Sequence, residues 1–188
     1  MSNSLLPIIV ALPLFGAMLP PLFVRFGRTA CAWSAAFIAG LALVLILSMA
    51  PAVFGGQTLL FQLPWLPAYG LNFSLRLDGL GMLFALLILG IGLLVILYAR
   101  YYLSAQDSMG RFYGLLLLFM GAMLGVVLAE NLLVLLVFWE LTSLSSFLLI
   151  GFWKHRADAR QGARLALMVT GAGGLSLLAG VLLLGQIS

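Results

Sequence analysis

The run Asn131-Leu-Leu-Val-Leu-Leu-Val-Phe-Trp-Glu140-Leu-Thr-Ser-Leu-Ser-Ser-Phe-Leu-Leu-Ile150 decides the fold of this chain. It holds about 20 residues, the length that an α-helix needs to cross a bilayer. Its apolar residues are continuous rather than alternating, so it predicts a membrane helix and not a barrel strand. Glu140 falls near the middle, where a charged side chain costs roughly 2.5–3.5 kcal/mol to insert. An anchoring helix would sooner carry Leu there, so Glu140 indicates proton or ion handling.

The composition of the whole chain is that of a membrane protein. Of its 188 residues, 64% are hydrophobic and only 7% are charged, whereas a soluble domain carries about 25% charged residues. We therefore expect an all-α, polytopic membrane helix bundle of about six transmembrane helices. The expected spans are Leu5–Val24, Ala30–Ala50, Leu80–Ala99, Phe112–Ala129, Asn131–Trp153 and Gly162–Leu184. In the first span, Pro13 predicts a kink and the pair Pro20-Pro21 predicts an early end of the helix.

The long loop between the second and third spans predicts a short β-hairpin. Residues Leu71–Leu77 alternate apolar and polar side chains, which is the period of a half-buried strand, and the apolar stretch Leu59–Leu63 precedes them. We expect the hairpin to lie on the membrane surface. Asp78 then directly precedes the third span, where an aspartate serves as a helix N-cap.

The basic residues predict the orientation of the chain. Three loops on one side carry all the Lys and Arg residues but Arg76: these are Arg25, Arg28, Arg100, Arg111, Lys154, Arg156, Arg160 and Arg164. Cytoplasmic loops carry the excess of Lys and Arg, so these three loops are predicted to face the cytoplasm and both termini to lie outside. The basic residues are scattered at loop edges, which argues against nucleic-acid binding.

Small residues predict close helix contacts. The fourth span contains Gly121-Ala-Met-Leu-Gly125, a pattern that lets a neighbouring helix approach closely. The sixth span predicts further tight contacts through its glycines, Gly171, Gly173, Gly174 and Gly180. Glu130 sits at the turn before the fifth span, where an acid favours the helix N-terminus, so we assign it a structural role.

Hydroxyl groups follow Glu140 along the fifth span. At 100° per residue, Thr142, Ser143 and Ser146 form a polar arc joined to the acid, and hydroxyls can donate hydrogen bonds to a carboxylate or hold water. The arc predicts a continuation of a proton path, with simple helix packing as the alternative. Lys154 and His155 lie in the basic loop beyond it and are a candidate cytoplasmic proton entry, because histidine titrates near neutrality.

Several classes of site are excluded by counting. With one cysteine, Cys31, and one histidine, the chain can form no internal disulfide, thiolate metal site or bis-histidine haem site. No hydrolase or phosphate-loop motif is present, so we expect no catalytic residue, cofactor or metal. All nine Lys and Arg residues lie in loops or at their edges, so a cationic partner of Glu140 is expected on other helices or another subunit.

Four segments resemble the antiporter-like subunits of Mrp-type cation/proton antiporters and of respiratory complex I. They are Phe138–Trp153, Arg76–Leu80, Tyr98–Leu103 and Glu130–Leu135. The chain is most similar to the N-terminal part of the large Mrp A subunit, with the L subunit of NADH-quinone oxidoreductase as the near relative. In that relative the sixth helix carries an Arg and an Asp where this chain has Gly171 and Gly174, which favours the Mrp side.

The resemblance implies about fourteen helices with two inverted five-helix repeats. A glutamate on the fifth helix, matching Glu140, is coupled there to a lysine on a broken seventh helix. Residues 1–111 would then hold the first three helices with the hairpin, and residues 112–188 the start of the first repeat. Because the chain ends at Ser188 after the sixth span, we expect a fragment or a short version of the family's long chain.

The expected function is that of a membrane subunit of a cation/proton antiporter in the bacterial inner membrane, with Glu140 in the proton path. Its partners would be other membrane subunits, the lipid bilayer, protons and a monovalent cation such as Na⁺. One alternative is a proton-pumping subunit of complex I or a related hydrogenase, which would make the chain part of a translocase. The other is a structural or assembly protein without a transport role.

Overall fold

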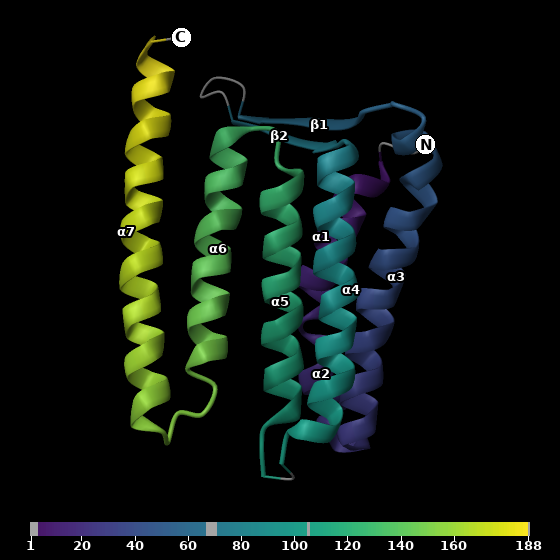
Figure 1. Ribbon diagram of the computed structural model, residues 1–188, viewed down its shortest axis with the longest axis vertical. Helices are drawn as coiled ribbons and strands as arrows, with labels where there is room; N and C mark the ends of the chain where they lie inside the picture. Colours follow the sequence, from purple (N-terminus) through teal and green to yellow (C-terminus); the bar gives the residue numbers. More distant parts are fainter. Residues whose placement is uncertain (1–3, 67–70, 105, 188) are drawn as a thin grey trace.

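The computed structural model describes residues 4–66, 71–104 and 106–187. Six helical segments are long and apolar enough to cross a membrane, as the sequence predicted. They stand side by side, and a β-hairpin crosses one end of the bundle (Figure 1). The spans are α1, α2 and a following 3₁₀ turn together (Leu5–Phe26), α3 (Arg28–Phe54), α4 (Gly79–Tyr102), α5 (Met109–Leu128), α6 (Leu132–Ile150) and α7 (Ala157–Ile187).

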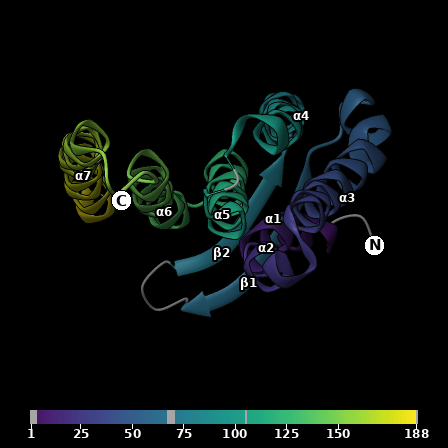
Figure 2. The same cartoon turned by 90° about the horizontal axis from the view of Figure 1, so that it is seen from below.

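Helix α5 is the centre of the bundle. It contacts α1, α2, α3, α4 and α6, whereas α7 contacts mainly α6. Seen along the helices, α5, α6 and α7 form a row that extends away from the cluster of α1 to α4 (Figure 2). More than half of the residues in the membrane-spanning stretch of α5 are buried, against 6% of those in the corresponding stretch of α7. The last helix therefore presents most of its apolar surface outward.

The first span is broken into two helices. Helix α1 (Leu5–Gly16) runs through Pro13, and a second short helix, α2 (Leu19–Leu22), follows before a 3₁₀ turn. Pro20 and Pro21 stand in the first turn of α2, so the prediction that this pair ends the helix is wrong. In a first helical turn the backbone N–H has no intrahelical partner, and proline costs nothing there. The kink at Pro13 stays a prediction.

The predicted β-hairpin is confirmed. Strand β1 (Leu59–Leu66) pairs antiparallel with β2 (Leu71–Leu77), and Phe61 lies opposite Leu75. An isolated hairpin is marginally stable in water; this one buries Leu75 and Leu77 completely against the ends of the helices. The hairpin also accepts a hydrogen bond through the Ser74 carbonyl from the backbone amide of Glu130, 3.1 Å away.

Asp78 caps α4 as predicted. Its Oδ1 accepts a hydrogen bond from the Gly81 amide at 2.8 Å, and its Oδ2 lies 2.6 Å from the guanidinium of Arg76. The cap satisfies a backbone amide that has no partner inside the helix. Strand β2 is thereby connected to α4 without a loop, which fixes the hairpin over the end of the bundle.

Gly121 and Gly125 of α5 contact two different neighbouring helices. A Cβ at Gly121 would lie 2.7 Å from Cγ of Leu14 in α1, and a Cβ at Gly125 would overlap the ring of Phe138 in α6. Both distances are too short for a side chain, so the close approach predicted from this pattern is confirmed. Because the two glycines lie four residues apart and still face different helices, they fix α5 between α1 and α6.

Candidate functional site: a membrane-embedded glutamate between two helices

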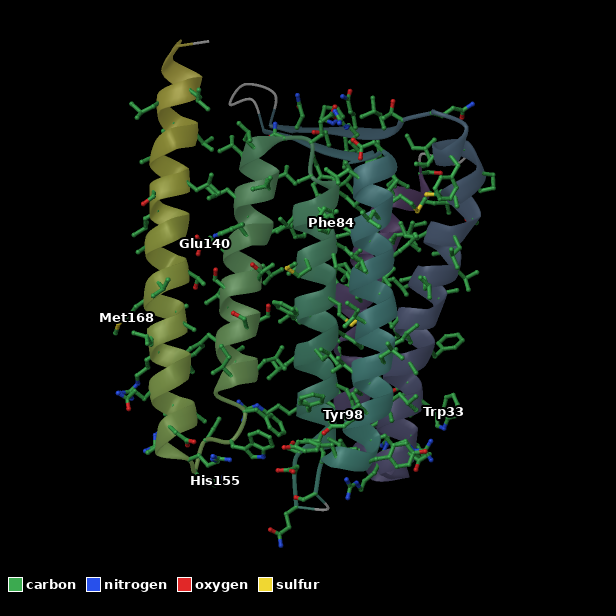
Figure 3. The ribbon with its side chains drawn as sticks, viewed as in Figure 1. Trp33, Phe84, Tyr98, Glu140, His155 and Met168 are labelled. Carbon is green, nitrogen blue, oxygen red and sulfur yellow. The ribbon has the colours of Figure 1, made fainter. Side chains whose placement is uncertain are left out.

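Helix α6 carries Glu140 about halfway between the two ends of the bundle. The helix begins after Asn131, whose side-chain oxygen accepts hydrogen bonds from the Leu133 and Val134 amides at 2.8 and 3.4 Å, and it ends at Ile150. Glu140 is half-buried and lies about halfway along α6, with its carboxyl group toward α7 (Figure 3). The cap fixes where α6 begins, and nine residues of helix then set the depth of the acid.

The carboxyl group of Glu140 packs against the backbone of α7 at Gly174. A Cβ placed on Gly174 would overlap Oε1 of Glu140 and lie 2.9 Å from its carboxyl carbon. Gly174 itself is buried. In the described part of the chain the carboxyl group has no hydrogen-bond or ion-pair partner. The acid is thus held between two helices without an opposite charge from residues 4–66, 71–104 or 106–187.

The other three α7 glycines that were predicted to make tight contacts have open space around them. Nothing in the described chain lies within 4 Å of a Cβ placed on Gly171, Gly173 or Gly180. Of the four glycines expected to make tight contacts in this span, only Gly174 does so within the structure. Its neighbour is a carboxyl group rather than an apolar side chain.

The hydroxyls after Glu140 bond to their own helix. Thr142 and Ser143 donate to the Trp139 carbonyl at 2.7 and 3.2 Å, and Ser146 donates to the Ser143 carbonyl at 3.1 Å. Short hydroxyl side chains in a helix commonly bond the carbonyl three or four residues earlier. With their protons donated to carbonyls, these hydroxyl groups can still accept hydrogen bonds through their oxygens. That the polar arc takes part in a proton path stays a prediction.

Two further hydroxyls, one on α6 and one on α7, were missed in the sequence. Ser145 is completely buried and donates to the Leu141 carbonyl at 2.7 Å. Thr170 lies on α7 one turn before Gly174 and donates to the Ala166 carbonyl at 2.9 Å. The spacing of four residues makes Thr170 and Gly174 neighbours on the surface of α7. That spacing is visible in the sequence, but only the contact of α6 with α7 gives it meaning.

Lys154 and His155 follow the end of α6. His155 lies at the opposite end of the bundle from the hairpin, well away from Glu140 (Figure 3). Lys154 and His155 both line a polar cavity of about 520 Å³ between the α4–α5 and α6–α7 connections. Trp153 donates its indole N–H to Asp107 at 2.9 Å across that cavity. Partial burial opposes the charge on Asp107, but hydrogen bonds from Ser104 and Trp153 keep its pKa below the ordinary value.

Glu130 lies at the hairpin end. Its side chain is exposed, and it lines a cavity of about 410 Å³ together with Arg76 and Asp78. Its backbone amide donates to the Ser74 carbonyl of the hairpin. The structure therefore keeps the three predicted positions apart: Glu130 at one end of α6, Glu140 in the middle, and His155 beyond the other end.

Comparison with known proteins finds antiporter-like relatives. The family described as NADH:quinone oxidoreductase/Mrp antiporter matches residues 129–188, and the N-terminus of chain 5 of NADH-ubiquinone oxidoreductase (complex I) matches residues 65–113. The chain is 50% identical over 182 residues to the A1 subunit of a Na⁺/H⁺ antiporter of Staphylococcus aureus, covering 96% of this chain. The chain is thus similar along nearly its whole length to an antiporter subunit, and two of its segments match antiporter-like family models.

Other relatives place the chain on the Mrp side of the family. It is 47% identical over 186 residues to a probable A/B subunit of a K⁺/H⁺ antiporter of Rhizobium meliloti (strain 1021), covering 99% of this chain. The Mrp complex of Dietzia sp. DQ12-45-1b matches 93% of the chain with a TM-score of 0.80 and 37% identity. The archaeal membrane-bound sulfane sulfur reductase shares the fold, with a TM-score of 0.77 and 23% identity over 97% of the chain.

The antiporter-like relatives are much longer than this chain. It spans 19% and 23% of the two curated relatives, and 18% and 28% of the chains in the two structures. The resemblance to the N-terminal part of an Mrp A subunit, predicted from four short segments, is confirmed along nearly the whole chain.

Proposed function

We propose that this chain works in a multisubunit cation/proton antiporter and that Glu140 takes up and releases a proton there. The observation that carries the proposal is the position of the carboxyl group, midway along a membrane-spanning helix and half-buried against α7. An ionisable residue at such a depth is expensive and usually functional.

The surroundings of Glu140 support a role that needs other subunits or further helices. In the described part of the chain no Lys or Arg pairs with it, and a lone acid has no charge with which to couple. We infer that the cation comes from the rest of the assembled antiporter, where the family resemblance implies a lysine. The relatives named as subunits of Na⁺/H⁺ and K⁺/H⁺ antiporters support a monovalent cation as the exchanged ion.

The same proposal includes an orientation and a proton entry. Eight of the nine basic residues lie at the end of the bundle opposite the hairpin, which supports placing that end in the cytoplasm and both termini outside. The polar cavity with Lys154, His155 and Asp107 then opens toward the cytoplasm and is the proposed entry for protons.

Glu140→Gln tests the proposal in the assembled complex. Everted vesicles from cells without other antiporters are energised, and exchange is followed by acridine orange fluorescence after Na⁺ or K⁺ is added. The amide keeps the size of the side chain but holds no exchangeable charge, so we expect exchange to fall at least about a hundredfold. The amount of assembled complex is measured in the same vesicles.

Glu130→Gln is the matched control, because it makes the same chemical change at an exposed position outside the helices. It should leave exchange near the wild-type rate. Normal exchange by a fully assembled Glu140→Gln complex would refute the proposal and favour a structural role for the chain.

A further inference from the structure

We propose that Gly174 is a positioning residue, and that its missing side chain sets where the carboxyl group of Glu140 sits between α6 and α7. This inference rests on the proposed proton-carrying role of Glu140. The three atoms nearest to a Cβ at Gly174 all belong to the Glu140 carboxyl group, namely Oε1, the carboxyl carbon and Oε2, the last two at 2.9 and 3.5 Å.

The contact is specific to this glycine. The α7 glycines at 171, 173 and 180 have no atom of the described chain within 4 Å of an added Cβ. Gly174 is buried, whereas the adjacent Gly173 is exposed. Among the glycines of α7, Gly174 is therefore the one at which an added Cβ would overlap an atom of the described chain, and that atom belongs to the acid.

The chemical nature of the contact makes positioning separable from folding. What a new Cβ would meet is the far end of a flexible side chain, not backbone or a packed ring. Glu140 can change rotamer and free the space at little cost in stability. A methyl group at position 174 should therefore displace the carboxyl group while α6 and α7 stay in contact.

The charged groups of the elements around α6 do not reach this point. In the described chain α6 packs against α5, α7 and β2. Their titratable and charged side chains, set near the ends of those elements, are Arg111 and Tyr113 of α5, Asp158, Arg160 and Arg164 of α7, and Arg76 of β2. The location of the Glu140 carboxyl group then depends on the shape of the α7 surface rather than on an ion pair within this chain.

Gly174→Ala in the assembled antiporter tests the inference. We expect wild-type levels of complex and an exchange rate lowered between tenfold and about a hundredfold, because a shift of about 1 Å in a reacting group can cost that much. The pH dependence of exchange should shift with it, since the acid moves into different surroundings. Gly173→Ala makes the same change one residue away and should stay within about twofold of wild type.

A shorter acid at position 140 provides the decisive test of the inference. Glu140→Asp withdraws the carboxyl group toward α6 and makes room for a methyl group at position 174. The double variant Glu140→Asp, Gly174→Ala should therefore exchange at least about threefold faster than Gly174→Ala alone, as expected for directly coupled residues. A loss of packing between α6 and α7 would not be relieved in this way.

The outcomes are distinct. Normal exchange by Gly174→Ala, an equal loss in Gly173→Ala, or a double variant no faster than Gly174→Ala would each overturn the inference while leaving the role of Glu140 in place. Normal exchange by Glu140→Gln would instead remove the proposed function itself.

Discussion

Three features determine where the carboxyl group of Glu140 lies. The Asn131 cap fixes the start of α6, the length of the helix sets the depth of the acid, and the bare backbone at Gly174 accepts it. The sequence predicted the depth of the acid from the length of the apolar run, whereas the Asn131 cap was found only in the structure, although a cap is a local property of the chain. The contact between Glu140 and Gly174 joins residues that are 34 positions apart in the chain, and it depends on the rotation of α7 about its axis.

Asp78 provides a second test at the residue scale. Its pKa lies below the ordinary value because the Gly81 amide and Arg76 bond the carboxylate. A lowered pKa in the folded state stabilises the fold above the unfolded pKa of about 3.9, and this contribution is lost as the pH falls through the folded value. Asp78→Ala should lower the free energy of unfolding by about 0.5–2 kcal/mol near neutral pH.

Asp78→Asn is the matched variant, since asparagine also caps helices but carries no charge. Thermal midpoints of the detergent-solubilised complex should differ between wild type and Asp78→Asn above about pH 4 and converge in more acidic buffer. A constant difference at every pH would contradict the assignment of the carboxylate as the stabilising form. The exposed ion pair with Arg76, whose side chain is 50% exposed, should add little.

At the scale of the helices, α5 joins the N-terminal cluster to the row formed by α6 and α7. Its side toward α6 includes Gly125, against which the ring of Phe138 rests, and Phe138 in turn contacts Phe73 of the hairpin at 6.5 Å between ring centroids. Phe138 lies two residues before Glu140 on α6. Packing at Gly125 therefore helps to fix how α6 is rotated.

Gly125→Ala should destabilise the α5–α6 contact, because the added methyl group overlaps a ring that is 8% exposed and held on both sides. Overpacking of this kind costs about 1–3 kcal/mol, measurable as a lower thermal midpoint of the purified complex. Gly90→Ala on α4, where an added Cβ meets nothing in the described chain within 4 Å, is the control. Adding Phe138→Leu to Gly125→Ala should restore part of the lost thermal midpoint. An unchanged midpoint in Gly125→Ala alone would refute the packing role.

At the scale of the whole molecule, the connections separate into two groups. The hairpin and the α5–α6 turn lie at one end, and the α4–α5 and α6–α7 connections lie at the other (Figure 1). The single cysteine, Cys31, is 1% exposed, so an introduced cysteine can be labelled against a quiet background.

Gln57→Cys and Gln106→Cys test the proposed orientation. Both positions are exposed and lie at opposite ends of the bundle. The asymmetry in Lys and Arg predicts that a membrane-impermeant maleimide labels Gln57→Cys in intact cells and Gln106→Cys only after permeabilisation. The reverse pattern would invert the topology and place the cavity with His155 outside.

The sequence by itself determined the six spans, the hairpin, the Asp78 cap and the depth of Glu140. Each of these depends on residues that are close together in the chain, through hydropathy, alternation or capping. The error at Pro20-Pro21 was also local: the pair fits a first helical turn as well as a helix end, and only the structure distinguishes the two.

Only the tertiary structure decided what the polar groups contact. The hydroxyls of Thr142, Ser143 and Ser146 bond carbonyls of α6 rather than the acid, a choice that periodicity cannot make. Likewise, the four α7 glycines that were predicted to make tight contacts look alike in the sequence, and Gly174 alone meets the carboxyl group of Glu140 within the described chain. The physical reason is that the register and rotation of two packed helices follow from all their contacts together, not from the pattern of either one.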